Sequence, residues 1–220
     1  MAFGLSYGGN GGGGNFLPVV KYDARAGRVF RSEKGVNGTE NIDITKMFKA
    51  VFDFENVEYG WIRFGAGAAP DFQLVRLGQA LPAKPSDEHR QGVRMVVKLS
   101  KDCGGDMREI AGTSAAFLSG MDRLHDDYEE QKAANAGKLP VVALIDTRAI
   151  ESGSGAKKST NYAPVFQIVS WVPRPAEMVP NLRGSSAPVQ RATPPVTGST
   201  IAAPPASAPA PAATGEDDFG

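Results

Sequence analysis

Hydrophobic and polar residues alternate along much of the middle of the chain, a pattern typical of strands. The clearest case is residues 93–99, in which Val93, Met95, Val97 and Leu99 share one face while Arg94, Val96 and Lys98 share the other. Apolar and β-branched runs predict further strands. They comprise a hairpin over 17–31 with its turn at 22–26, a long bent strand or two strands broken near Gly60 over 46–64, and strands at 72–77, 140–150 and 162–172.

One segment has the spacing of a helix. Between residues 113 and 136, apolar side chains recur every three or four positions, at Phe117, Leu118, Met121, Leu124 and Tyr128. Thr113 or Ser114 is a suitable N-cap, and Gly137 is a suitable stop.

The order of these elements is typical of the OB-fold. We therefore expect a mainly β chain that forms an OB-fold-like barrel, with one helix between strands 3 and 4, an added N-terminal hairpin and a disordered C-terminal tail. A different β-barrel or an α+β sandwich would fit the same order.

Composition divides the chain into four zones. Residues 1–15 are glycine-rich and predict a flexible arm, and residues 16–183 hold nearly all large apolar side chains and form the predicted folded domain. Residues 184–214 consist almost entirely of Ala, Pro, Ser, Thr and Gly, which predicts a disordered linker. Residues 215–220 differ from the linker, because they carry three acids and an aromatic.

Charge and cysteine content narrow the classes of protein. The chain has 24 basic and 24 acidic residues, but the acids concentrate at residues 113–136 and 184–220, which leaves a modest basic surplus elsewhere. One cysteine, Cys103, and two histidines exclude an intramolecular disulfide and a structural zinc site within one chain. No stretch approaches the roughly 18 apolar residues of a membrane span, so we expect a cytoplasmic protein with no metal, no cofactor and no membrane partner.

Enzyme motifs are weak throughout. The glycine tract at 9–14 has no predicted strand before it, and residues 153–160 lack the glycine that a phosphate loop needs before its Lys-Ser pair. Ser114 is better explained as a helix cap than as a nucleophile. His125 and the acids around it on the predicted helix indicate a solvated face rather than a metal site. We therefore expect a protein that is not an enzyme.

Basic and aromatic residues interleave in the predicted strands, and this mixture suits single-stranded nucleic acid. Cations neutralise phosphates, and aromatic rings stack on bases without demanding a sequence. Any one of the aromatics could instead belong to a core, and the lysine-containing loop could be an ordinary hairpin loop. The predicted DNA-binding residues are Tyr22, Arg28, Phe30, Arg31, Trp61, Arg63, Phe72, Arg76, Arg94, Lys98, Lys157 and Lys158.

The end of the chain combines an aromatic residue with acids after a long linker. Phe219 would anchor in an apolar pocket of a partner protein, while Glu216, Asp217 and Asp218 would contact a basic rim. A merely solubilising tail is the alternative.

These features together resemble the single-stranded DNA-binding proteins of bacteria and bacteriophages. The resemblance lies in the OB-type element order, the linker and the end Glu216-Asp217-Asp218-Phe219, although Gly220 follows the aromatic here. It implies a protein that protects single-stranded DNA, recruits replication, recombination and repair proteins through its tip, and acts in the bacterial cytoplasm. The resemblance allows a homo-oligomer but does not give the number of subunits. A structural or adaptor β-domain of a virion or complex, without nucleic-acid binding, is the alternative.

Overall fold

The computed structural model describes residues 17–36, 38–65, 69–152 and 158–179. All of them belong to the first of the chain's two compact units, Met1–Ser185. None of the helices in these ranges is long and apolar enough to cross a membrane. The described residues form ten strands and one α-helix. The strands are β1 Val19–Asp23, β2 Arg28–Gly35, β3 Gly38–Asp43, β4 Lys49–Phe52, β5 Glu58–Arg63, β6 Asp71–Arg76, β7 Arg90–Leu99, β8 Met107–Gly112, β9 Lys138–Ser152 and β10 Ser159–Pro173.

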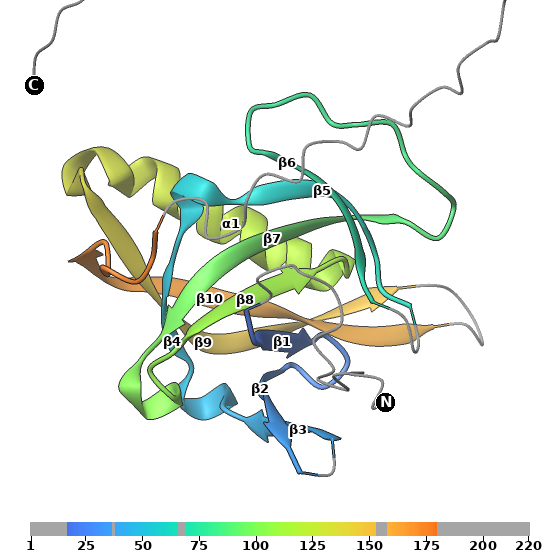
Figure 1. Cartoon of the computed structure of the whole chain (residues 1–220), viewed down its shortest axis with the longest axis horizontal. Coiled ribbons are helices and arrows are strands. Elements are labelled where there is room, and N and C mark those ends of the chain that lie inside the picture. The colour runs from blue at the N-terminus through green and yellow to red at the C-terminus, as the bar shows by residue number, and fades with distance from the viewer. Residues whose placement is uncertain (1–16, 37, 66–68, 153–157, 180–220) are drawn as a thin grey trace, which may run out of the picture. The chain divides into compact units, whose positions relative to one another are not determined.

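The strands form one mixed, open sheet (Figure 1). Its order is β10-β9-β4-β7-β8-β1-β2-β3, and β5 pairs with both β6 and β7. The pairing of β1 with β8 is parallel, whereas the other pairings between described strands are antiparallel. The prediction of a mainly β chain with one helix is confirmed. The ladder of described strands does not close into a barrel, and the helix follows the eighth strand rather than the third.

Both β4 and β5 pair with β7, so they form a single interrupted strand beside it. The interruption is the 3-10 turn η2, Phe54–Asn56, where Asp53 N–H still donates to Val96 O at 3.2 Å. The strand therefore breaks at residues 53–57, not near Gly60 as the sequence predicted. The break lies where Phe54 turns inward to the core.

The N-terminal hairpin is confirmed as β1 and β2, whose turn is closed by Gly27 N–H donating to Asp23 O at 2.8 Å. Gly27 has φ of 65°, a conformation that favours glycine. Strands β3 and β8 were not predicted. Neither has the clear alternation of apolar and polar residues seen in β7.

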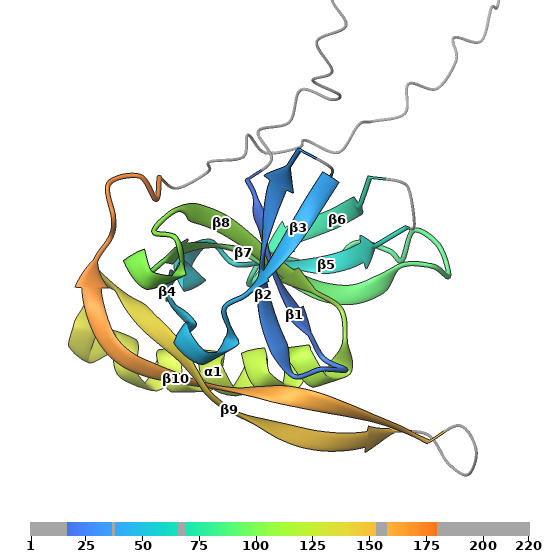
Figure 2. The same cartoon turned by 90° about the horizontal axis from the view of Figure 1, so that it is seen from below.

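Helix α1, Ala115–Gln131, begins at Ser114, whose side chain accepts a hydrogen bond from Phe117 N at 3.2 Å. This confirms Ser114 as the cap. The 3-10 turn η4, Lys132–Asn135, continues the helix, and Gly137 has φ of 74° just beyond it. In Figure 2, α1 lies behind the long β9–β10 hairpin, and it packs against β10.

The core lies between the concave side of the sheet and α1. Aromatic side chains from distant parts of the chain meet there, with Phe52 and Phe166 ring centroids 6.0 Å apart. The remaining aromatics of this core are Phe48, Phe54, Phe117 and Tyr128. Their burial fixes which side of β7 faces inward.

Candidate nucleic-acid interface

Strand β7 has two distinct sides. Met95, Val97 and Leu99 are buried in the core, and the intervening Arg94, Val96 and Lys98 point away from it. We call the side that carries Arg94 and Lys98 the outer face. Strand register extends this face across β6, β5, β8, β1 and β2. Its basic and aromatic members are Lys21, Arg28, Phe30, Phe72, Arg76, Arg90, Arg94 and Lys98.

Three of the predicted DNA-binding residues, Phe72, Arg76 and Arg94, meet at one part of the outer face. Glu58 pairs in register with both Arg76 and Arg94, which brings these two arginines to either side of it. The Arg94 guanidinium lies 4.6 Å from the centre of the Phe72 ring and donates to Glu58 Oε2 at 2.6 and 2.8 Å. Lys98 lies further along the same strand. Phe72 is half-buried, and its ring also contacts the Phe64 ring edge-on, with 6.2 Å between centroids.

A second group lies on the N-terminal hairpin. Lys21 of β1 stands opposite Phe30 of β2, and Lys21 is exposed while Phe30 is half-buried. Arg28 is exposed and pairs with Asp43 at 2.9 Å. Hydrogen bonds from Thr45 and the charge of Arg28 hold the pKa of Asp43 below its usual range. The hairpin therefore adds an aromatic ring flanked by two exposed cations.

Two outer-face cations were not predicted, Lys21 and Arg90. Both share the period-two alternation of their strands, with Arg90 in phase with Arg94. This alternation could have identified both residues from the sequence. Arg90 went unrecognised because the predicted strand began at residue 93.

Several predicted residues lie elsewhere. Tyr22 belongs to the core side, where its ring stacks on Phe117 at 5.9 Å and its hydroxyl donates to Tyr162 O at 2.8 Å. Burial, with a smaller contribution from Asp23, raises the pKa of Tyr22 to about 12. An aromatic ring held in this way is not available to bases.

Trp61 and Arg63 point to the opposite side of β5 from Arg94. Trp61 Nε1 donates to Pro82 O at 2.7 Å, so the loop between β6 and β7 covers the indole. Arg63 pairs with Glu88 of the same loop at 3.1 Å. Period-two spacing correctly placed the two side chains together, but on the side away from the outer face.

Arg31 and Lys158 do not lie in the cluster around Glu58 either. Arg31 shares the side of Val20, donates to Cys103 O at 2.9 Å and pairs with Glu33 at 2.9 Å. Lys158, just before β10, pairs with Glu151 across the β9–β10 hairpin at 2.6 Å. Lys157 and the tip residues 216–219 lie outside the described residues.

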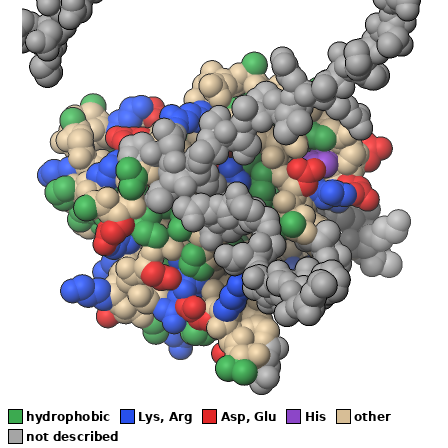
Figure 3. Space-filling model, viewed as in Figure 1, with side chains coloured by type: hydrophobic (Ala, Val, Ile, Leu, Met, Phe, Trp, Pro, Cys, Tyr) green, Lys and Arg blue, Asp and Glu red, His purple; other side chains and the backbone are tan. Residues whose placement is uncertain are grey.

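The cations of the outer face are largely accompanied by acids. Lys98 pairs with Glu177 at 2.6 Å, and a hydrogen bond from Lys98 lowers the pKa of Glu177. A surface pair of this kind contributes at most about 1 kcal/mol, so a phosphate can replace Glu177 beside Lys98 at little cost. Arg94 differs, because it is 9% exposed and its guanidinium is held by Glu58. In the view of Figure 3, basic and acidic side chains are interspersed over the surface. The face is accordingly suited to moderate, salt-sensitive binding.

Two other arginines hold the fold together rather than face solvent. Arg108 is 1% exposed and bonds to Ser32 O, Glu33 and Asp106. Arg174 pairs with Asp53, which is 2% exposed, and with Glu55. Hydrogen bonds to these acids raise the pKa of Arg174 above its usual range. Phosphates cannot reach Arg108 without disturbing the fold, and the partly exposed Arg174 is already paired with two acids.

One arrangement has the residue types of a hydrolase. Ser86 Oγ lies 2.8 Å from His89 Nδ1, and His89 Nε2 lies 3.2 Å from Asp71 Oδ2. His89 is 4% exposed, and its backbone N–H closes a turn on Ser86 O. The contacts explain how the loop before β7 is fixed to β6. Among the described residues there is also no group of three or more His, Cys, Asp or Glu able to hold a metal.

Comparisons of the chain with protein-family models, with curated protein sequences and with solved structures found no significant match. What the chain binds is therefore inferred from these residues and their geometry.

Proposed function

We propose that this protein binds single-stranded DNA across its outer face without strong sequence preference. The observation that carries the proposal is the meeting of Phe72, Arg76 and Arg94 around Glu58, on the same face as Phe30 and its flanking cations. Single-strand binding needs this combination of rings for bases and cations for phosphates. It does not need the concave catalytic cleft of an enzyme.

The strand connectivity supports an OB-type arrangement. If β4 and β5 count as one interrupted strand, the order along the chain is that strand, β7, β8, α1, β9 and β10. The interrupted strand pairs with both β7 and β9, as the first strand of an OB barrel must. We propose that β1 takes part in the remaining side of the barrel, because it pairs with β8 and Tyr162 N of β10 donates to Ala24 O just beyond it at 2.6 Å. In this scheme the helix lies between the third and fourth core strands, as the sequence predicted.

OB-folds bind nucleic acid on the face of their second and third strands and in the adjacent loops. Here those strands are β7 and β8, and Arg94 and Lys98 lie on that face. We further propose that residues 216–219 recruit replication and recombination proteins. A structural or adaptor role without nucleic acid is the competing function.

Binding is best tested with fluorescently labelled oligo-dT by anisotropy. The intrinsic fluorescence of Trp61 and Trp171 is a poor probe, because the first lies under a loop and the second stacks on Tyr128 at 5.8 Å. We expect log Kd to rise with log salt, with a slope of about 0.7 for each phosphate neutralised in a single strand. Absence of binding at low salt, or affinity indifferent to salt, would contradict the proposal and favour the structural role.

A matched pair of variants locates the site. Replacing Lys21, Arg28 and Arg76 by alanine removes three outer-face cations, and replacing Arg123, Lys132 and Lys138 removes three near α1. We expect about tenfold weaker dT binding and a shallower salt dependence from the first variant only. Equal loss from both would mean that net charge, not this face, determines binding.

A further inference from the structure

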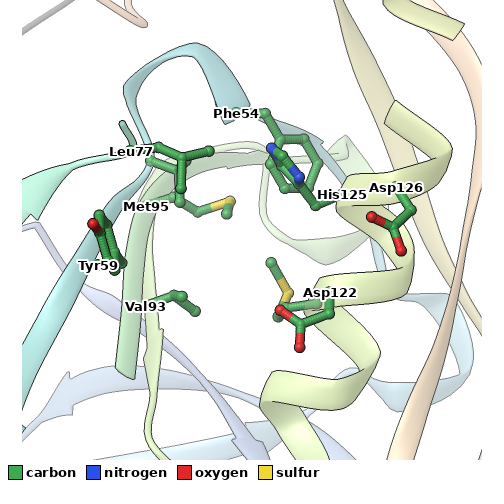
Figure 4. A pocket seen from close by; sticks show the side chains of 10 residues that line it. Phe54, Tyr59, Leu77, Val93, Met95, Asp122, His125 and Asp126 are labelled. Carbon is green, nitrogen blue, oxygen red and sulfur yellow. The ribbon is translucent and has the colours of Figure 1, made fainter. Parts of the chain in front are cut away.

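A pocket of about 210 Å³ opens between β5, β7 and α1, on the side of β7 opposite to the outer face (Figure 4). An apolar cavity of roughly 150 Å³ can hold a benzene ring, so this pocket has room for one large apolar side chain. Its apolar lining consists of Phe54, Val57, Tyr59, Leu77, Val93, Met95 and Met121.

The helix side of the pocket is acidic. Asp122 and Asp126 are both exposed and lie one turn apart on α1, with His125 beside them (Figure 4). The His125 ring contacts Phe54 of the lining edge-on, at 5.6 Å between centroids. Neither aspartate forms an ion pair with another described residue. The pocket thus combines an apolar floor with two carboxylates that no described cation neutralises.

We propose that this pocket docks a large apolar side chain, such as phenylalanine or leucine, from a partner protein segment rich in lysine and arginine. The apolar side chain would bury surface against the lining, and the flanking cations would pair with Asp122 and Asp126. Charge selects this occupant over two others at hand. Nucleic acid and the chain's own end, with Glu216, Asp217 and Asp218 beside Phe219, are negative and would be repelled by this rim.

The inference does not depend on DNA binding. Val93 and Met95 line the pocket, while Arg94 between them points to the outer face. The two surfaces therefore lie back to back on one strand. Occupation of either leaves the other accessible.

The chain has two histidines, which makes imidazole NMR a simple readout. The probe is the synthetic peptide Lys-Lys-Phe-Lys-Lys with blocked ends, added to the full-length protein. We expect the His125 resonances to shift and those of His89, which is buried against Ser86 and Asp71, to stay in place. Peptides with Ala in place of Phe, or Glu in place of Lys, should shift neither.

Variants of exposed acids then test the rim without threatening the fold. At about 50 mM salt, Asp122→Asn with Asp126→Asn should weaken the probe peptide about three- to tenfold, as expected for two exposed charge pairs. The control, Asp127→Asn with Glu130→Gln, removes two exposed acids of the same helix that do not line the pocket and should change affinity less than about twofold.

Three results would overturn the proposal. One is an unshifted His125 up to about 1 mM peptide, the weak end of specific affinities. Another is equal binding of the Ala peptide, which would leave only non-specific charge attraction. The third is a His125 shift caused by oligo-dT or by the peptide Gly-Glu-Asp-Asp-Phe-Gly, which would assign the pocket to nucleic acid or to the chain's own end. A failure of dT binding would not affect the proposal.

Discussion

The two sides of β7 differ in which charge is left without a partner. On the outer face Arg94 and Lys98 each pair with an acid, while the exposed Lys21 forms no ion pair with a described residue. On the other side, the exposed Asp122 and Asp126 likewise lack one. A net charge of zero therefore conceals two surfaces to which we assign opposite partners, phosphates on the outer face and basic peptides on the other. Alternation along a single strand is enough to separate them, because neighbouring residues point in opposite directions.

The largest expected effect is on the free energy of unfolding, and it comes from breaking the ion pair between Arg174 and Asp53. Arg174→Ala would leave Asp53, which is 2% exposed, without its charged partner next to η2. Breaking a buried pair from one side costs about 3–5 kcal/mol, and the partial exposure of Arg174 reduces this to about 2–3 kcal/mol. Urea unfolding measures the loss. The exposed control Lys138→Ala should change stability by less than about 0.5 kcal/mol, and a comparable small loss for Arg174→Ala would show that the pair is unimportant.

Next in size is a change that affects the outer face alone. Phe72→Ala removes a ring that we expect to stack on a base, and should weaken dT binding about ten- to thirtyfold. The salt dependence should stay unchanged, because no charge is lost. Anisotropy titrations at several salt concentrations measure both quantities.

Phe72→Tyr keeps a ring at this position and should retain most of the affinity. Binding of the Lys-Lys-Phe-Lys-Lys peptide should not respond to either variant. If Phe72→Ala left dT affinity unaltered, stacking at this position would be ruled out.

Sequence patterns predicted more of the fold than of the candidate site. Alternation located β7 and the N-terminal hairpin, and the spacing of Phe117, Met121 and Leu124 located α1, because burial on one side imposes those periods. The break at Asp53 was missed. Asp53 at the break pairs with Arg174, 121 positions away, and no local window contains such a contact.

The candidate site was harder to predict than the fold. Alternation with period two shows which side chains share a face of a strand, but not which face is open to solvent. Trp61 and Arg63 were correctly placed together, but Glu58 and Ile62, not these two, share the side of Arg94, and the loop at Pro82 covers Trp61. Tyr22 looked available because its neighbours are basic. Only the fold brings Phe117 and Tyr162 against it.

Alkaline pH tests that assignment of Tyr22 to the core side. The pKa of its phenol is about 12 in the folded protein, against about 10 in an unfolded chain. The folded state therefore holds the proton more tightly, and the associated stability is complete below pH 10 and lost as pH rises from 10 to 12. Allowing for solvent at this half-buried group, the loss is about 1–2 kcal/mol.

Urea unfolding at pH 9 and 11.5 measures this loss, with Tyr22→Phe as reference. Tyr22→Phe lacks the titrating hydroxyl, so its deficit relative to the natural protein should shrink across that interval. A deficit independent of pH would mean that the phenol is solvated, and Tyr22 would return to the set of residues available to bases.

The smallest expected effect distinguishes the two sides most directly. Glu177→Gln removes the acid that pairs with Lys98 on the outer face, and Glu88→Gln removes the acid that pairs with Arg63 on the opposite side of β5. Each variant raises the net charge by one. Each also leaves one cation, Lys98 or Arg63, without its acidic partner. If phosphates bind only the outer face, Glu177→Gln should tighten dT binding about twofold at low salt, and Glu88→Gln should leave it unchanged. Equal tightening by both variants would show that dT responds to total charge alone, because a site confined to one face cannot gain from a cation released on the other.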